Sequence, residues 1–119
     1  MKRILIVDDS PMIRMMIKYS FFSEFEIIDE ESAISALPII KNSNIDLFLL
    51  DLNMPEMDGI SLTKEIRKIP KYSETPIIML TVTSSSEKIE EGKKAGINAW
   101  VVKPCDVSKI LDTVKSYIW

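Results

Sequence analysis

The chain has 119 residues, of which 46% are hydrophobic, and a formal net charge of −3. This length suits one globular domain with a real core, so we expect a single domain over residues 1–119. The acidic balance and the lack of a dense Lys/Arg block argue against direct binding to nucleic acid, which rests on clustered positive charge. One cysteine, Cys105, excludes an internal disulfide, and no stretch resembles a signal peptide or a membrane span, so we expect a cytoplasmic protein without membrane contact.

The sequence contains no histidine. Nucleophile pairs of the Ser-His and Cys-His kind are therefore excluded, as are metal sites with histidine ligands. Carboxylates and hydroxyls remain to carry any chemistry.

Five short apolar segments recur along the chain, and most are continuous rather than alternating. This pattern is typical of parallel strands that are covered on both faces. It predicts strands over residues 3–8, 25–29, 46–51, 76–81 and 99–103.

Helical patterns separate these segments. Ser10 as N-cap and Pro11 in the first turn predict the start of the first helix. Its apolar face consists of Ile13, Met16, Ile17 and Phe21. A second helix near residues 31–41 contains Pro38, which removes a backbone donor, so we expect it to be kinked or short.

The later helices carry clearer boundary signals. Pro70 should end the third helix, a capping box from Ser84 to Glu87 should begin the fourth, and Gly96 should close it. Asp106 should cap the fifth. The apolar stripe of the third helix is Leu62, Ile66 and Ile69, and that of the fifth is Val107, Ile110, Leu111, Val114 and Ile118.

Strands that alternate with helices imply an α/β fold with right-handed crossovers. We expect a doubly wound, five-stranded parallel sheet in the flavodoxin-like order 2-1-3-4-5, with five helices on both faces. Ligands bind such sheets outside the carboxyl ends of the strands, at the point where the strand order reverses. That point lies between strands one and three, so Asp8 and Asp9 should meet Asp51.

Polar residues stand where four of the apolar segments end: Asp8-Asp9, Asp51, Thr81 and Lys103. Two carboxylates about 5 Å apart repel by roughly 3 kcal/mol at an effective dielectric of about 20, so three would cost roughly 10 kcal/mol. A cation must offset this repulsion. An oxygen-only ligand set favours a hard divalent ion, and Mg²⁺ binds through one or two carboxylates together with phosphate.

This set of residues suits phosphoryl transfer. Lys103 would add a second, fixed cation, the Thr81 hydroxyl would donate to a phosphoryl oxygen, and Asp51 would be the nucleophile. Each residue taken singly also has an ordinary explanation, because an Asp-Asp pair is a common polar turn. Jointly, on the ligand-binding edge, they favour a metal and phosphate site.

Over essentially all its length the chain resembles a receiver domain of bacterial two-component signalling, specifically a stand-alone, CheY-like response regulator. The motifs that carry the resemblance are the acidic pair in LIVDDSPMIR, the loop DLNMPEMDG, the Thr81 that ends IIMLT, and the lysine of VVKP. The DxxMPxxDG element at residues 51–59 is the most specific of them.

The resemblance implies that Asp51 accepts a phosphoryl group from a phosphohistidine on a histidine kinase. It also implies that Asp9, Asp51 and the backbone carbonyl of Asn53 hold Mg²⁺, while Asp8 acts largely through metal-bound water. Such a protein is a regulator rather than an enzyme, with self-catalysed transfer and autodephosphorylation only.

Further implications concern the output. Lys103 and Thr81 would contact the phosphoryl oxygens, and the Lys103–Pro104 peptide bond would be cis. Thr81 would turn inward and Trp100 would rotate into the vacated space, repacking the surface of the fourth helix, fifth strand and fifth helix. The output would be binding to a downstream protein, with a chemotaxis role at a flagellar switch as one candidate and phosphorelay as another.

Two positions depart from the family pattern, and two further residues lie where they would affect the rate of dephosphorylation. Relatives mostly carry Tyr or Phe where Trp100 stands, so a larger indole has to fit the vacated pocket. Val82 occupies a place where the family has Ala or Gly, and a branched side chain there narrows access to the site. Asn53 and Thr83 lie near the same edge and would help to set the dephosphorylation rate.

Three other functions compete with this interpretation. A phosphatase of the haloacid dehalogenase type needs a second acid two residues after its nucleophile, and Asn53 stands there instead. A flavodoxin-like cofactor binder would need a phosphate cradle where this chain has Asp8-Asp9. The third is an interaction module with a receiver fold that works independently of phosphorylation, against which the complete acidic and Thr/Lys set argues.

Replacing Val82 with Ala should speed phosphotransfer or self-dephosphorylation, because the smaller side chain opens the site to the donor or to water. An assay with acetyl phosphate measures both rates in the two proteins. Equal rates would contradict the role assigned to Val82.

Overall fold

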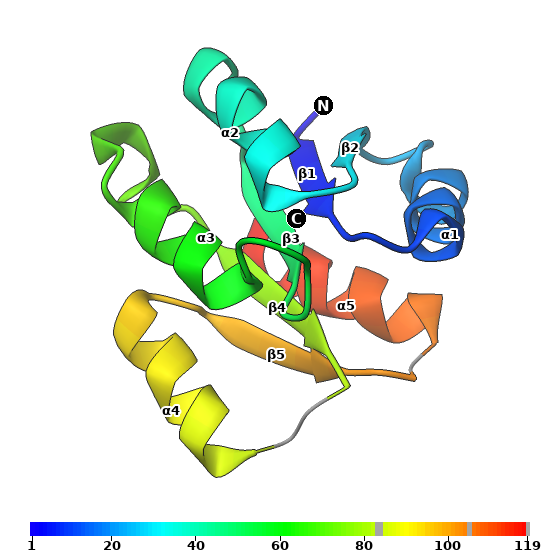
Figure 1. Cartoon of the computed structure of the whole chain (residues 1–119). Helices are drawn as coiled ribbons and strands as arrows, with labels where there is room; N and C mark the ends of the chain where they lie inside the picture. Colours follow the sequence, from blue (N-terminus) through cyan, green and yellow to red (C-terminus); the bar gives the residue numbers. More distant parts are fainter. Residues whose placement is uncertain (83–84, 105, 119) are drawn as a thin grey trace.

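A computed structural model describes residues 1–82, 85–104 and 106–118 of the chain. Its centre is a parallel sheet of five strands in the order β2-β1-β3-β4-β5 (Figure 1). The strands are β1 (Arg3–Val7), β2 (Glu26–Glu30), β3 (Leu47–Asp51), β4 (Ile77–Thr81) and β5 (Ala99–Val102). The predicted doubly wound sheet and its strand order are therefore confirmed.

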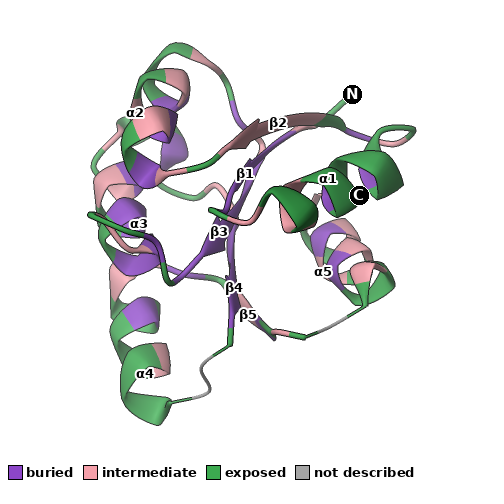
Figure 2. Cartoon of the chain, turned by 45° about the vertical axis from the view of Figure 1, so that its right-hand side comes forward, coloured by how far each residue is buried: buried purple, intermediate pink, exposed green. Residues whose placement is uncertain are grey.

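Five α-helices cover the two faces of the sheet. They are α1 (Pro11–Phe21), α2 (Ala33–Asn42), α3 (Gly59–Arg67), α4 (Ser86–Ala95) and α5 (Val107–Ile118), with a 3₁₀ turn, η1 (Pro70–Tyr72), after α3. Figure 2 shows α1 and α5 on one face and α2, α3 and α4 on the other. Within the described ranges, no helix is long and apolar enough to cross a bilayer.

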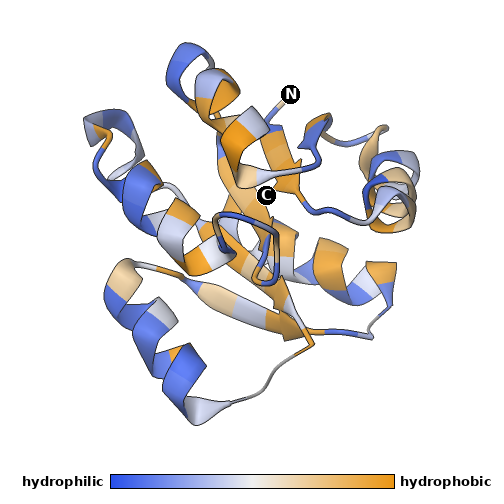
Figure 3. Ribbon diagram, in the orientation of Figure 1, coloured by the Kyte–Doolittle hydropathy of each residue, from blue (hydrophilic) through white to orange (hydrophobic). Residues whose placement is uncertain are grey.

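The sheet divides the core into two apolar clusters. Residues of β3 alternate between them, so Phe48 packs with α2 and α3 whereas Leu49 packs with α1 and α5. All five residues of β3 are buried, as are those of β4. Figure 3 shows these central strands as hydrophobic and the outer side of α4 as hydrophilic. Continuous apolar segments thus correspond to strands that are covered on both sides.

Most of the predicted helix boundaries are confirmed. The Ser10 side chain accepts a hydrogen bond from the Ile13 amide, with Pro11 at the first helical position. Gly96 closes α4 in the left-handed conformation at φ 111°. The N-cap of α4 is Ser85, whose side chain accepts from the Lys88 amide, so the predicted cap was one residue too early. Ser84 itself lies outside the described residues.

The second helix was expected to be kinked or short because of Pro38. It runs for ten residues through Pro38, so it is not short, and a kink stays a prediction. Pro38 is exposed and costs one backbone hydrogen bond, while Ala33, Ala36 and Ile40 are buried against the core. Their packing stabilises the helix more than one missing donor destabilises it.

Gly59 allows the loop after β3 to pack tightly on the strand that ends in Asp51. A Cβ atom at this position would lie 2.5 Å from the Asp51 carbonyl oxygen and 2.7 Å from Met79 Sδ. The Gly59 amide donates to the Leu52 carbonyl at 2.9 Å, which holds the two segments together. A larger residue would therefore push against the backbone of Asp51.

Replacing Gly59 with Ala should lower the free energy of unfolding by about 1–3 kcal/mol, the usual cost of overpacking a tight site. Urea denaturation measures this value. The control is Ser61→Ala on the exposed side of the same helix, which should change stability by less than about 0.5 kcal/mol. Equal effects of the two substitutions would contradict the close packing at Gly59.

Candidate functional site

Three carboxylates from separate segments gather at the carboxyl edge of the sheet. Asp8 directly follows β1 and Asp51 ends β3, and these two strands are neighbours. One carboxylate oxygen from each of Asp8, Asp9 and Asp51 lies within 4.8 Å of the other two. Asp8 is fully buried, Asp51 is 5% exposed and Asp9 is exposed. The meeting of these three residues, predicted from the strand order, is confirmed.

Lys103 reaches the same cluster from the end of β5. Its Nζ donates to Asp8 Oδ2 at 3.0 Å and lies 3.5 Å from Asp51 Oδ1. Burial lowers the pKa of Lys103, but the hydrogen bond and charge of Asp8 and the charge of Asp51 outweigh burial and leave this pKa above its usual value. Lys103 is therefore a permanent cation. The Lys103–Pro104 peptide bond is cis, as the family resemblance implied.

The electrostatics of Asp51 show that the cluster is short of positive charge. Burial raises its pKa to about 6, and the neighbouring charge of Asp8 acts in the same direction. Lys103 and the Asn53 amide, which donates to Asp51 Oδ1 at 3.3 Å, offset only part of this rise. Three carboxylates face one ammonium group, and their donor atoms are all oxygen. A hard divalent cation such as Mg²⁺ fits this donor set.

Three more predicted site residues lie at the same edge of the sheet. Thr81 ends β4 and is fully buried, one residue beyond Leu80, which pairs with Asp51 across the two strands. Asn53 and Val82 are exposed at the edge, Val82 to the extent of 67%. Thr83 lies outside the described residues. The structure thus brings Thr81 and Lys103 to the edge that holds the carboxylates.

Trp100 of β5 packs beneath α4. A Cβ atom at Gly92 would collide with Trp100 Cζ2 and would lie 2.9 Å from Ile97 Cδ1, so the indole depends on the missing side chain of Gly92. Its Nε1 is buried and has no hydrogen-bond partner among the described residues. Inward rotation of Trp100 stays a prediction.

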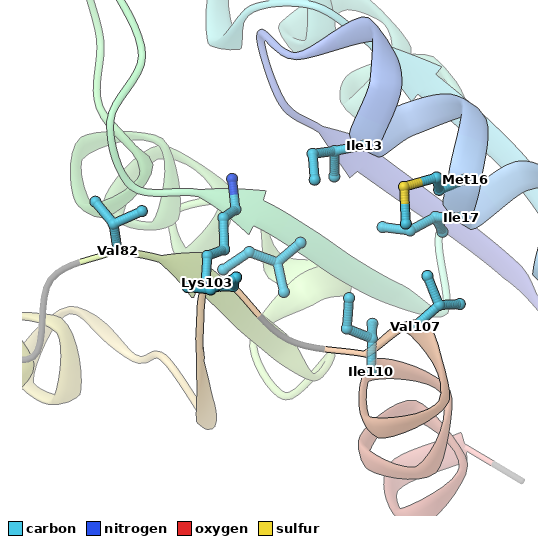
Figure 4. A pocket seen from close by; sticks show the side chains of 9 residues that line it. Ile13, Met16, Ile17, Val82, Lys103, Val107 and Ile110 are labelled. Atoms are coloured by element: carbon cyan, nitrogen blue, oxygen red, sulfur yellow. The ribbon is translucent and has the colours of Figure 1, made fainter.

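An apolar cleft of about 400 Å³ beside the site was not predicted. Figure 4 shows side chains of α1 opposite side chains of α5, with Val82 and Lys103 at one end. The lining residues are Ile13, Met16, Ile17, Leu80, Val82, Lys103, Pro104, Val107 and Ile110. Met16, predicted on the apolar face of α1, lines this cleft and is 41% exposed.

Arg14 also escaped prediction as a site residue. Its guanidinium donates to the backbone carbonyl of Asp8 and pairs with Asp29 at the end of β2. The only sequence signal was its position six residues after Asp8.

Comparison with known proteins identifies the family. Residues 4–115 match the model of the response regulator receiver domain. The chain belongs to this family. Its membership makes it a phosphoacceptor protein of two-component signalling.

Individual receiver proteins resemble the chain along nearly its whole length. The chemotaxis protein CheY of Bacillus subtilis is 36% identical over 114 residues, which are 94% of this chain and 93% of that protein. The structure of chemotaxis protein CheY4 of Vibrio cholerae is 34% identical, with a TM-score of 0.95 and 99% of each chain covered.

A third relative bears on the metal. The receiver domain of a sensor histidine kinase from Pseudomonas aeruginosa is 27% identical, with a TM-score of 0.88, and the comparison covers 98% of this chain and 97% of that one. That structure has a magnesium ion coordinated in its active-site cleft.

The raised pKa of Asp51 predicts that the metal-free protein loses stability as the pH rises. The folded-state pKa of about 6 lies above the usual aspartate value of 3.8, so the folded protein holds this proton more tightly than the unfolded chain does. The stability that the bound proton confers is complete below about pH 4 and is lost as the pH rises through about 6. Asp51→Asn should therefore match the wild type near pH 4 and exceed its free energy of unfolding by up to about 3 kcal/mol at pH 7.5.

Urea denaturation in EDTA at both pH values measures this difference. Asp112→Asn, which removes an exposed carboxylate on α5, is the control and should change little at either pH. A wild type that is as stable as Asp51→Asn at pH 7.5 would contradict the predicted penalty.

Proposed function

We propose that Asp51 is the phosphoacceptor and that a phosphohistidine of a partner histidine kinase is the donor. The observation that supports this assignment is the joint placement of the Asp51 carboxylate at the end of β3, nearly buried, and the Lys103 ammonium 3.5 Å from its Oδ1. An Asp51 oxygen attacks phosphorus while the phosphorus–nitrogen bond breaks. The electron pair of that bond stays on the imidazole, which ends the step neutral with one proton.

The other polar residues stabilise the negative charge on the oxygens of the transferred phosphoryl group. Lys103 stays protonated and holds one phosphoryl oxygen, and the Thr81 hydroxyl donates to another. Asp9, Asp51 and the Asn53 backbone carbonyl would hold Mg²⁺. When bound, Mg²⁺ supplies positive charge to the phosphoryl oxygens.

The contacts of Asp8 favour a supporting role for it. One of its carboxylate oxygens accepts a hydrogen bond from the Ser10 amide at 2.9 Å, and the other accepts from Lys103 at 3.0 Å. Both oxygens are therefore already bonded within the protein. This agrees with an action of Asp8 through metal-bound water rather than by direct ligation.

The proposed output is binding to a downstream protein through the surface of α4, β5 and α5. Thr81 and Trp100 lie on the same side of the sheet and connect the site to this surface. The similarity to chemotaxis proteins CheY makes a chemotaxis target, such as a flagellar switch, the first candidate. The proposed chemistry is self-catalysed transfer and autodephosphorylation only, in the cytoplasm.

Incubation with acetyl phosphate and Mg²⁺ should add the mass of one phosphoryl group to the wild type, because Mg²⁺ and Lys103 then both offset the charge at Asp51. Asp51→Asn should add none, because an amide is not a nucleophile. Intact-mass spectrometry makes the measurement, with Asp112→Asn as the control that should behave like the wild type. A phosphorylated Asp51→Asn protein, or no modification of the wild type, would contradict the proposal.

A further inference from the structure

Arg14 connects the backbone of the acidic pair to a neighbouring strand. It lies in the first turn of α1, where its amide donates to the Ser10 carbonyl at 3.2 Å. Its side chain extends back toward the end of β1, where Nη1 donates to the Asp8 carbonyl oxygen at 2.5 Å. Nε donates to Asp29 Oδ2 at 3.0 Å, and the side chain is 15% exposed. Figure 1 shows the neighbouring strands, β1 and β2, that it joins.

The contact with Arg14 completes the bonding of Asp8. The Asp8 amide donates to the Glu30 carbonyl at 3.1 Å, and its two carboxylate oxygens accept from Ser10 and Lys103. Arg14 binds the one group that remains, the backbone carbonyl. A peptide unit is planar, so a bond to this oxygen fixes the plane that joins Asp8 to the next residue.

That next residue is Asp9, whose side chain has little else to hold it. Asp9 is exposed, and no donor among the described residues forms a hydrogen bond or ion pair with its carboxylate. Its carboxylate nevertheless lies within 4.8 Å of the carboxylates of Asp8 and Asp51. The orientation of the Asp9 backbone must therefore hold the Asp9 carboxylate near the other two.

We propose that Arg14 is a positioning residue of the metal site, an inference that rests on the proposed function. By holding the peptide plane between Asp8 and Asp9, its guanidinium keeps the Asp9 carboxylate near Asp51. Asp29 has two roles in this arrangement. It anchors the guanidinium, and its negative charge reduces the repulsion between Arg14 and a bound cation.

Lys18 provides a matched control because it also pairs with Asp29, at 3.0 Å, but does not contact Asp8. Arg14→Met and Lys18→Met each remove one cation from Asp29, and only the first removes the bond to the Asp8 carbonyl. Titration with Mg²⁺ alone, followed by backbone amide NMR shifts, gives the dissociation constant and shows whether each variant is folded.

Arg14→Met should raise the Mg²⁺ dissociation constant about tenfold, as is typical when a partner outside the ligand shell is lost, and Lys18→Met should change it less than about twofold. Asp29→Asn keeps Arg14 but removes the carboxylate that anchors it, so it should raise the Mg²⁺ dissociation constant by a smaller factor. If Arg14→Met does not fold, Asp29→Asn serves as the test of the inference. Equal constants for the wild type and for the Arg14 or Asp29 variant would overturn the inference alone. A wild type that does not bind Mg²⁺ would overturn the proposed function as well.

Discussion

The interaction on which this molecule depends is the repulsion among carboxylates that its fold forces together. Asp8 and Asp51 are almost completely buried, and one oxygen of each lies within 4.8 Å of the other. Two charges at such a separation repel strongly where water is scarce. Lys103 offsets part of this energy by bonding Asp8 and approaching Asp51. Burial of Asp51, together with the remaining repulsion from Asp8, raises the pKa of Asp51 to about 6 and makes the cluster a ready acceptor of further positive charge.

The elements around the cluster keep this unfavourable arrangement in place. The buried strands β1 and β3 fix the backbones of Asp8 and Asp51, and their burial in two apolar clusters supplies the stabilising free energy. Close packing at Gly59 limits movement of the Asp51 backbone. A buried carboxylate pair would otherwise relax by turning toward water, and a rigid frame prevents this.

Much of this arrangement could be predicted from the sequence because strand order alone decides which residues meet. Five apolar segments, most of them continuous, predicted the sheet, and the reversal of strand order placed Asp8 and Asp9 beside Asp51. The contact between Arg14 and the Asp8 carbonyl could not be predicted, because a side chain that bonds a backbone oxygen leaves no pattern in the sequence. The cleft at Met16 and Val82 was missed for a related reason, since helical spacing shows which face is apolar but not whether a neighbouring helix fills the space against it.

The helix boundaries show where local signals compete. Ser84 and Ser85 both offer a hydroxyl for the start of α4, and one-residue spacing does not distinguish them in advance. Pro38 gave a clear local signal against a full second helix, yet the buried side of α2 outweighed it. Local rules hold best where the surrounding packing does not oppose them.

The indole of Trp100 fits beneath α4 only because position 92 has no side chain. Positions 92 and 100 lie on different elements, yet a side chain at position 92 would collide with the indole at position 100. A bulkier residue at position 92 of α4 would require a smaller ring at position 100 of β5. The residue at position 92 of α4 thus decides how large an aromatic ring β5 can hold at position 100.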